Sequence, residues 1–164
     1  MAPTDDAARV DALLADLARI DNADWERAEE ELQKIWSRSG SAAVDLLTRR
    51  GRDAINEGDF PKAIAHLSAA IELAPDFAEA WNARATAFFL MDRFGLSLED
   101  LSQALSLNPR QYRALYGLGV MLEALGRHED ALAAFRESHA INPHQEQLED
   151  AMERLGRAVD GMDL

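Results

Sequence analysis

Apolar residues recur at spacings of three and four along most of the chain, so that they fall on one face of an α-helix. Two clear cases are the segment from Ala63 to Ile71 and the segment from Ala131 to Phe135. No segment shows the strict alternation of apolar and polar residues that favours a half-buried strand. The pattern therefore predicts an all-α fold.

The helical pattern itself repeats along the chain. Pro75, Pro109 and Pro143 are 34 residues apart, and each has an apolar residue two positions before it. Because proline cannot continue a helix, each one is predicted to close a unit. The apolar residues before the prolines are Leu73, Leu107 and Ile141, and five further positions keep this period: Gly51, Ala85 and Gly119; Phe60, Phe94 and His128; Ala63, Ser97 and Ala131; Leu67, Leu101 and Phe135; Ala70, Ala104 and Ser138.

The size of the residues at these positions explains the period. Small residues allow two helices to approach closely, and large ones fill the space between neighbouring helix pairs. Gly58 and Gly126 fall in the middle of the first and third units, where one helix is expected to end and the next to begin. Each unit is therefore predicted to be a helix pair.

This pattern resembles the tetratricopeptide-repeat (TPR) family, whose 34-residue repeats consist of helix, turn, helix and a closing proline. Three repeats match, at residues 44–77, 78–111 and 112–145, and Trp81 occupies the family's early aromatic position in the middle repeat. The resemblance implies a TPR helical-repeat solenoid, which is a right-handed stack of antiparallel helix pairs.

The ends of the chain are predicted to differ from the three repeats. Residues 9–43 form a degenerate TPR-like helix pair, since Trp25, Ala28, Leu32 and Ile35 reproduce second-helix positions at an offset of 35 instead of 34. Residues 146–158 read as a polar capping helix, which keeps an open stack soluble. Residues 1–8 and 159–164 are expected to be flexible.

The resemblance also implies where a partner would bind. TPR stacks curve so that the first helices of the repeats line a concave groove, and a few positions in each repeat contact peptides. On this sequence the candidates at those positions are Asp45, Thr48, Arg52 and Asn56; Glu79, Asn82, Thr86 and Phe89; and Arg113, Tyr116, Val120 and Glu123. Amide and guanidinium donors beside aromatic area suit a peptide of a partner protein.

One TPR subfamily grips the carboxyl terminus of chaperones with a clamp of basic and amide residues. Arg113 fits one clamp position, but Thr48 stands where the clamp has a lysine, and Gly117 stands where it has an arginine or a lysine. Arg52 and Ala83 stand where it has asparagines. The clamp is therefore not supported.

Arg50 and Arg84 lie 34 residues apart, at a position that the family usually fills with leucine. They could donate to an anion in the groove. We favour the alternative, in which the arginine stems pack along the helix interface while the guanidinium groups pair with acids of the neighbouring helix.

Charge and composition narrow the partners and the chemistry. The net charge is −13, from 30 acids against 17 bases, so the chain repels nucleic acid and anionic membrane surfaces. No apolar run is long enough for a membrane-spanning helix. The chain has no cysteine, and its four histidines include no pair spaced i, i+4 for a metal. We therefore expect no catalytic site, no cofactor and no metal, and a protein that is not an enzyme.

Two functional hypotheses remain. The first is an adaptor or scaffold whose concave groove captures a peptide segment of another protein. The second is a structural module that forms homo-oligomers through its helical ends. The segments 36–43, 74–87 and 118–126 are similar to small alphaproteobacterial TPR proteins. That similarity implies a periplasmic location if a signal peptide was removed before Met1, and a cytoplasmic one otherwise.

Overall fold

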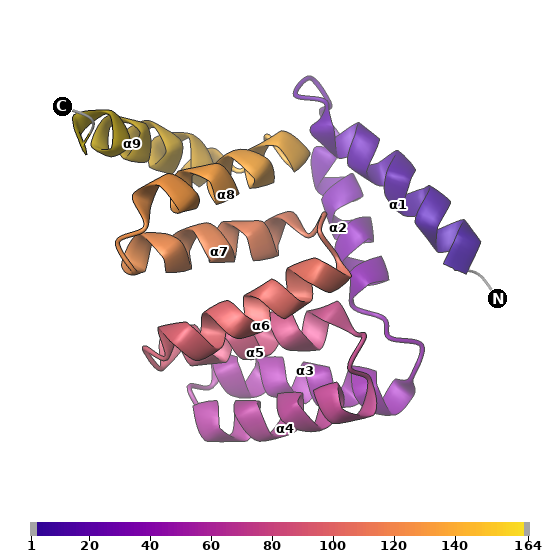
Figure 1. Cartoon of the computed structure of the whole chain (residues 1–164). Coiled ribbons are helices and arrows are strands. Elements are labelled where there is room, and N and C mark those ends of the chain that lie inside the picture. The colour runs from indigo at the N-terminus through magenta and orange to yellow at the C-terminus, as the bar shows by residue number, and fades with distance from the viewer. Residues whose placement is uncertain (1–2, 163–164) are drawn as a thin grey trace.

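The computed structural model describes residues 3–162, which form nine α-helices and no β-strand (Figure 1). The expected all-α TPR solenoid is therefore confirmed. Within this range no helix is both long and apolar enough to cross a membrane. The helices are α1 (Pro3–Ala18), α2 (Trp25–Trp36), α3 (Ala42–Asn56), α4 (Phe60–Leu73), α5 (Ala78–Leu90), α6 (Phe94–Leu107), α7 (Tyr112–Ala124), α8 (His128–Ile141) and α9 (Glu146–Met162).

Three helix pairs form the stack: α3 with α4, α5 with α6, and α7 with α8. Glycines at a repeated position bring the two helices of a pair close together. A Cβ atom placed on Gly51 would lie 2.4 Å from Cγ of Leu67, and one placed on Gly119 would lie 2.4 Å from Cε1 of Phe135. Both distances are too short for carbon atoms in contact, so the close approach depends on glycine.

The turn inside each repeat is left-handed at one residue. Gly58 has φ +77° and Gly126 has φ +75°, whereas the middle repeat has Asp92 at this position with φ +57°. Aspartate is one of the few side chains that this conformation tolerates. The three turns therefore share one backbone shape although only two of them contain glycine.

Arg84 and Asp100 form a largely buried ion pair between α5 and α6. Nε and Nη2 of Arg84 donate to the two carboxylate oxygens of Asp100, both at 2.8 Å, and Nη1 donates to Oγ of Ser68 at 3.2 Å. This arrangement agrees with the interpretation of Arg84 as a packing residue paired with a neighbouring helix. For Arg50, at the same repeat position, the interpretation is wrong, because its side chain is exposed and no ion pair joins it to another described residue.

The two ends of the chain are more helical than the sequence predicted. α1 begins at Pro3, so residues 3–8 are helical although flexibility was expected there, and α9 continues to Met162 instead of ending at residue 158. Leu148 and Leu155 of α9 are buried in one cluster with Leu132 and Phe135 of α8. Residues 1–2 and 163–164, also expected to be flexible, lie outside the described range.

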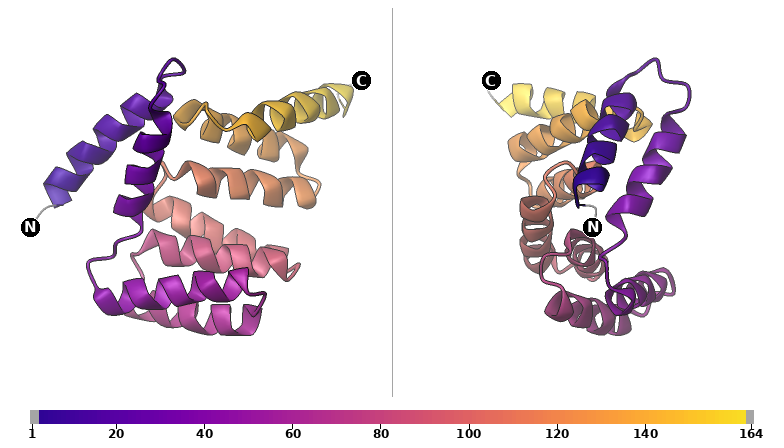
Figure 2. Two further views of the ribbon diagram at one scale, coloured as in Figure 1. Left: turned by 180° about the vertical axis from the view of Figure 1, so that it is seen from behind. Right: turned by 90° about the vertical axis from the view of Figure 1, so that its right-hand side faces the viewer.

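The helices before the first repeat, α1 and α2, do not continue the stack. α1 and α2 form a hairpin that runs crosswise to the helices of the repeats, and α1 packs against α8 instead of the hairpin stacking on α3 and α4 (Figures 1 and 2). The connection to α3 contains Gly40 at φ +89°, and Ser39 is bound by the carboxylate of Asp45. This turn directs the hairpin toward the far end of the stack.

Candidate partner-binding groove

The first helices of the three repeats line a cavity of about 610 Å³. This volume lies within the range of about 300–1,000 Å³ that is usual for ligand sites. Residues of α3, α5 and α7 line it together with Ser97 and Leu101 of α6, and Gln33 of α2 and its C-cap Ser37 also contribute. The groove expected of an open TPR stack is therefore partly enclosed by the N-terminal hairpin.

Eight of the twelve candidate residues lie together in this cavity. Asn82 and Thr86 occupy the middle of the α5 side, where Oγ1 of Thr86 donates to the main-chain oxygen of Asn82 at 3.2 Å. The side-chain amide of Asn82 has no hydrogen bond to any described residue. The eight residues are Arg52, Glu79, Asn82, Thr86, Phe89, Arg113, Tyr116 and Val120.

An apolar strip follows the deeper part of the cavity. Phe89 packs on Phe94 with ring centroids 5.6 Å apart, and Tyr116 packs on Phe135 at 5.7 Å. The aromatic rings are therefore held from behind by the second helices of their own repeats. Together with Val120 they offer a rigid apolar surface, which costs little conformational entropy when it binds a partner.

The other four candidates do not line the cavity. Thr48 is buried and donates to the main-chain oxygen of Val44 at 2.8 Å, and Asp45 accepts from Ser39 at the start of α3. Asn56 is exposed at the end of α3. Glu123 pairs with Arg154 of α9. Packing, capping and the C-terminal helix therefore engage three of these side chains.

The two cations of the cavity each have a carboxylate partner. Arg52 of α3 pairs with Glu79 of α5, whose side chain is only 10% exposed. Glu79 lies in the first turn of α5 and serves this pair. Arg113 of α7 pairs with Glu29 of α2 at 3.3 Å. The cavity thus combines two neutralised arginines with an apolar strip.

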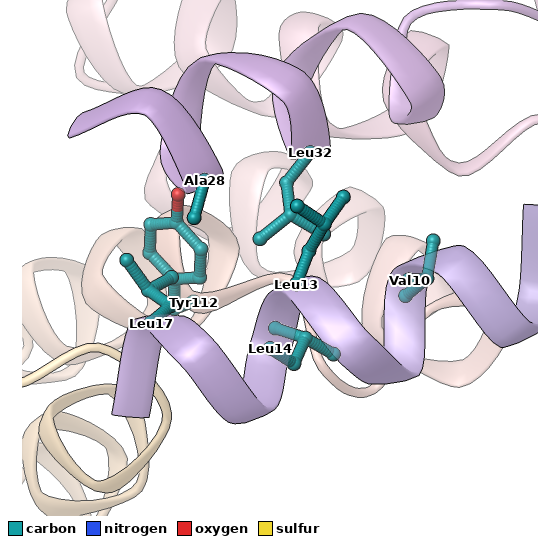
Figure 3. Close-up of a cluster of buried hydrophobic side chains, with 7 residues drawn as sticks. All are labelled: Val10, Leu13, Leu14, Leu17, Ala28, Leu32 and Tyr112. Atoms are coloured by element: carbon teal, nitrogen blue, oxygen red, sulfur yellow. The ribbon is translucent and has the colours of Figure 1, made fainter. Parts of the chain in front are cut away.

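Tyr112, which the sequence analysis did not select, is the residue that joins the hairpin to the stack. Its ring is fully buried between α1 and α2, among Leu13, Leu17 and Leu32 (Figure 3). Its hydroxyl accepts a hydrogen bond from Nε2 of Gln33 at 3.3 Å. Burial raises the pKa of the Tyr112 phenol above its ordinary value, so the hydroxyl keeps its proton.

One signal in the sequence could have drawn attention to Tyr112. It is the first residue of the third repeat, and the first residues of the other two are the smaller Val44 and Ala78. A large aromatic ring at a position that otherwise holds a small side chain needs additional partners, and here the hairpin provides them. The hairpin residues Gln33 and Ser37 had no comparable signal, because residues 9–43 matched a repeat that would lie elsewhere.

Matches to known proteins agree with this architecture. Family models described as tetratricopeptide repeats match residues 51–92 and 91–146. A TPR repeat-containing protein of Rhizobium etli is 32% identical over 154 residues, which cover 93% of this chain and 76% of that protein. The chain belongs to the TPR family. As a TPR protein it is a protein-interaction module, and no catalytic function is indicated.

Solved TPR domains have the same fold. The Arabidopsis OM64 TPR domain is 25% identical, with a TM-score of 0.68 over 71% of this chain and 96% of that domain. The first TPR domain of Spaghetti (RPAP3), solved with an HSP90 peptide, is 20% identical, with a TM-score of 0.70 over 73% of this chain and 95% of that domain.

Among the described residues of this TPR protein, no group of three histidine or acidic residues could hold a metal.

Proposed function

We propose that this TPR protein is an adaptor that binds a peptide segment of a partner protein in the cavity along α3, α5 and α7. The main support for this proposal is that eight candidate residues from three repeats line one cavity of about 610 Å³. The uncommitted amide of Asn82 suits a main-chain group of a peptide, and the strip of Phe89, Tyr116 and Val120 suits an apolar side chain.

The charges of the cavity argue for a partner other than a chaperone tail. A clamp for a free carboxyl terminus needs several cations together, and Arg52 is held by Glu79 of the neighbouring repeat, so displacement of Glu29 would free Arg113 alone. Thr48 and Gly117 supply no charge at the clamp positions. The HSP90 peptide bound by the RPAP3 domain therefore does not define the ligand expected here.

The test is partner capture with one obstructed cavity and one matched control. Thr86→Arg places a long side chain at an exposed site inside the cavity. Ser106→Arg makes a comparable change at an exposed site of α6, outside the cavity. Both hydroxyls donate only to a main-chain oxygen of their own helix, of Asn82 and of Gln103 respectively, so the two variants lose a similar bond.

We expect the wild type and Ser106→Arg to capture the same proteins from a lysate after gentle crosslinking, with identification by mass spectrometry. The Thr86→Arg variant should bind peptides derived from those proteins at least roughly tenfold more weakly, because the long arginine side chain occupies the cavity and adds a positive charge to it. Equal binding by the two variants, with unchanged circular dichroism, would refute binding in this cavity.

A further inference from the structure

The N-terminal hairpin, α1 with α2, has a hydrophobic core of its own. Leu13 and Leu17 of α1 face Ala28 and Leu32 of α2, and all four side chains are buried (Figure 3). On the outer face Arg9 and Glu31 join the two helices with hydrogen bonds of 2.6 and 2.7 Å. The two helices of the hairpin therefore make apolar contacts with each other as well as with the third repeat.

The hairpin docks on the third repeat through a small set of contacts. Tyr112 is the one side chain of the repeats that is fully buried within the hairpin core. Around it, Trp25 stacks on His144 with ring centroids 4.9 Å apart, and Arg110 pairs with Asp11 at 2.6 Å. The Arg110–Asp11 pair is exposed, so it contributes little to docking.

Two residues of α2 pair with polar groups at the start of α7, where Arg113 lines the cavity and the neighbouring Tyr112 is buried in the hairpin core. Oε1 of Glu29 accepts from the Tyr112 hydroxyl at 3.1 Å and pairs with Arg113 at 3.3 Å. Nε2 of Gln33 donates to the same hydroxyl. Glu29 and Gln33 are four residues apart and so share one face of the helix. Without α2, Arg113 and the Tyr112 hydroxyl would be unpaired and open to another ligand.

We propose that the hairpin is a built-in competitor for the α7 end of the groove, and that the partner segment which displaces it is a helix of the same chemistry. Such a helix presents a carboxylate to Arg113 and an amide to Tyr112, four residues apart. This inference rests on the proposed function and adds to it the kind of partner and the means of regulation. A partner gains full access only when it replaces Glu29 and Gln33.

The hairpin is tethered to the repeats, and the tether determines how strongly it weakens the binding of a free peptide. Residues 37–41 connect α2 to α3, and a short linker of this kind gives an effective concentration on the order of millimolar. A free peptide of the same sequence therefore competes poorly with the docked hairpin. It should bind well only where the tethered copy is weakened.

The experiment weakens the hairpin from its own side, so that Tyr112 and Arg113 stay intact. The full chain carries Glu29→Ala with Gln33→Ala, and its control carries Glu30→Ala with Lys34→Ala, an exposed pair on the same helix. The probe is a fluorescent synthetic peptide of residues 3–38, in its native form and in a form with Glu29→Ala and Gln33→Ala. Fluorescence anisotropy measures its affinity for each chain.

We expect the native peptide to bind the Glu29→Ala/Gln33→Ala chain at least roughly tenfold more tightly than it binds the wild type or the control chain. The substituted peptide should bind that chain several-fold more weakly than the native peptide. Equal affinity of the native peptide for all three chains, no binding to any of them, or equal binding of the two peptides would overturn the proposal.

A second measurement reports on the hairpin directly and needs no ligand. The chain has no cysteine, so spin labels can be placed at exposed positions with Ala23→Cys on the hairpin and Gln103→Cys on α6. We expect a longer and broader distance distribution in the Glu29→Ala/Gln33→Ala chain than in the control, and an unchanged distribution would contradict the proposal. The two proposals can fail separately. If the hairpin opens and rebinds as described but Thr86→Arg leaves partner capture intact, peptide binding in the cavity is refuted and the displaceable hairpin is not.

Discussion

Gly119 and Gly117 lie two residues apart on α7, and the same substitution at each should change stability in opposite directions. A Cβ on Gly119 would lie 2.4, 2.5 and 2.9 Å from three ring atoms of Phe135. A Cβ on Gly117 would meet only Leu101, at 3.7 Å, which is an ordinary contact distance. The two sites therefore separate the effect of packing from the effect of helix propensity.

The expected magnitudes follow from two opposing terms. Replacing glycine by alanine inside a helix stabilises by about 0.5–1 kcal/mol, while overpacking a well-filled core costs about 1–3 kcal/mol. Gly117→Ala has the first term alone and should stabilise by about 0.5–1 kcal/mol. Gly119→Ala has both terms, and the middle values of the two ranges give a net destabilisation of about 1 kcal/mol, because the Phe135 ring is buried and cannot move aside freely.

Urea and thermal denaturation followed by circular dichroism measure both variants. At this chain length 1 kcal/mol corresponds to about 2–4 °C in Tm, so the two variants should differ by several degrees. The middle repeat provides a further check, since it has Ala85 in place of glycine and Leu101 in place of phenylalanine. Phe135→Leu should therefore reduce the cost of Gly119→Ala, with a coupling of at least about 0.5 kcal/mol in a double-mutant cycle. An increase in Tm on Gly119→Ala would refute the packing argument.

Three further predictions concern other parts of the molecule. Arg84→Met should cost about 3 kcal/mol because it leaves the buried Asp100 carboxylate without its cation, and Arg84→Met with Asp100→Leu should recover most of that loss in urea denaturation. Asp92→Gly should stabilise the protein by about 0.5–1 kcal/mol, since glycine adopts the left-handed conformation without the steric cost of a Cβ atom. A lower Tm would contradict this. The hydrogen bond from Arg9 lowers the pKa of Glu31. The stabilising effect of this Arg9–Glu31 pair on the hairpin is therefore present above the ordinary glutamate pKa and is lost as the pH falls through the lowered pKa. Arg9→Ala should raise the pKa of Glu31 in a carboxyl NMR titration.

Much of the repeat architecture could be predicted because it depends on contacts within 34 residues. The roles of Gly51 and Gly119 can be predicted from the sequence, since each glycine contacts a large side chain of its own repeat, Leu67 or Phe135. The closing prolines can be recognised from their spacing alone. The interpretation of Arg84 succeeded for the same reason, because Asp100 is on the next helix. Local patterns thus determine the stack.

The position of the hairpin could not be predicted in this way. Its packing positions resemble a repeat, but the offset of 35 and the turn at Gly40 direct it elsewhere, and Tyr112 is far away in the sequence. The family positions that predict the groove residues assume an open concave side. Eight of them do lie in one cavity, but the contribution of Gln33 and Ser37 depends on the docking of the N-terminal hairpin on the third repeat. Whether the eight residues bind a partner stays a prediction.

The docked hairpin also has a consequence for how the chain folds. In a repeat stack each unit contacts only its neighbours, so folding can begin anywhere and the terminal units can open independently. Here the hydrogen bonds of Tyr112 and Arg110 join residues that are 79, 83 and 99 positions apart. Closing loops of that length costs entropy, so the hairpin should dock after the repeats have formed. Once docked, it links the first repeat to the last, and the whole chain gains the cooperativity of a closed domain.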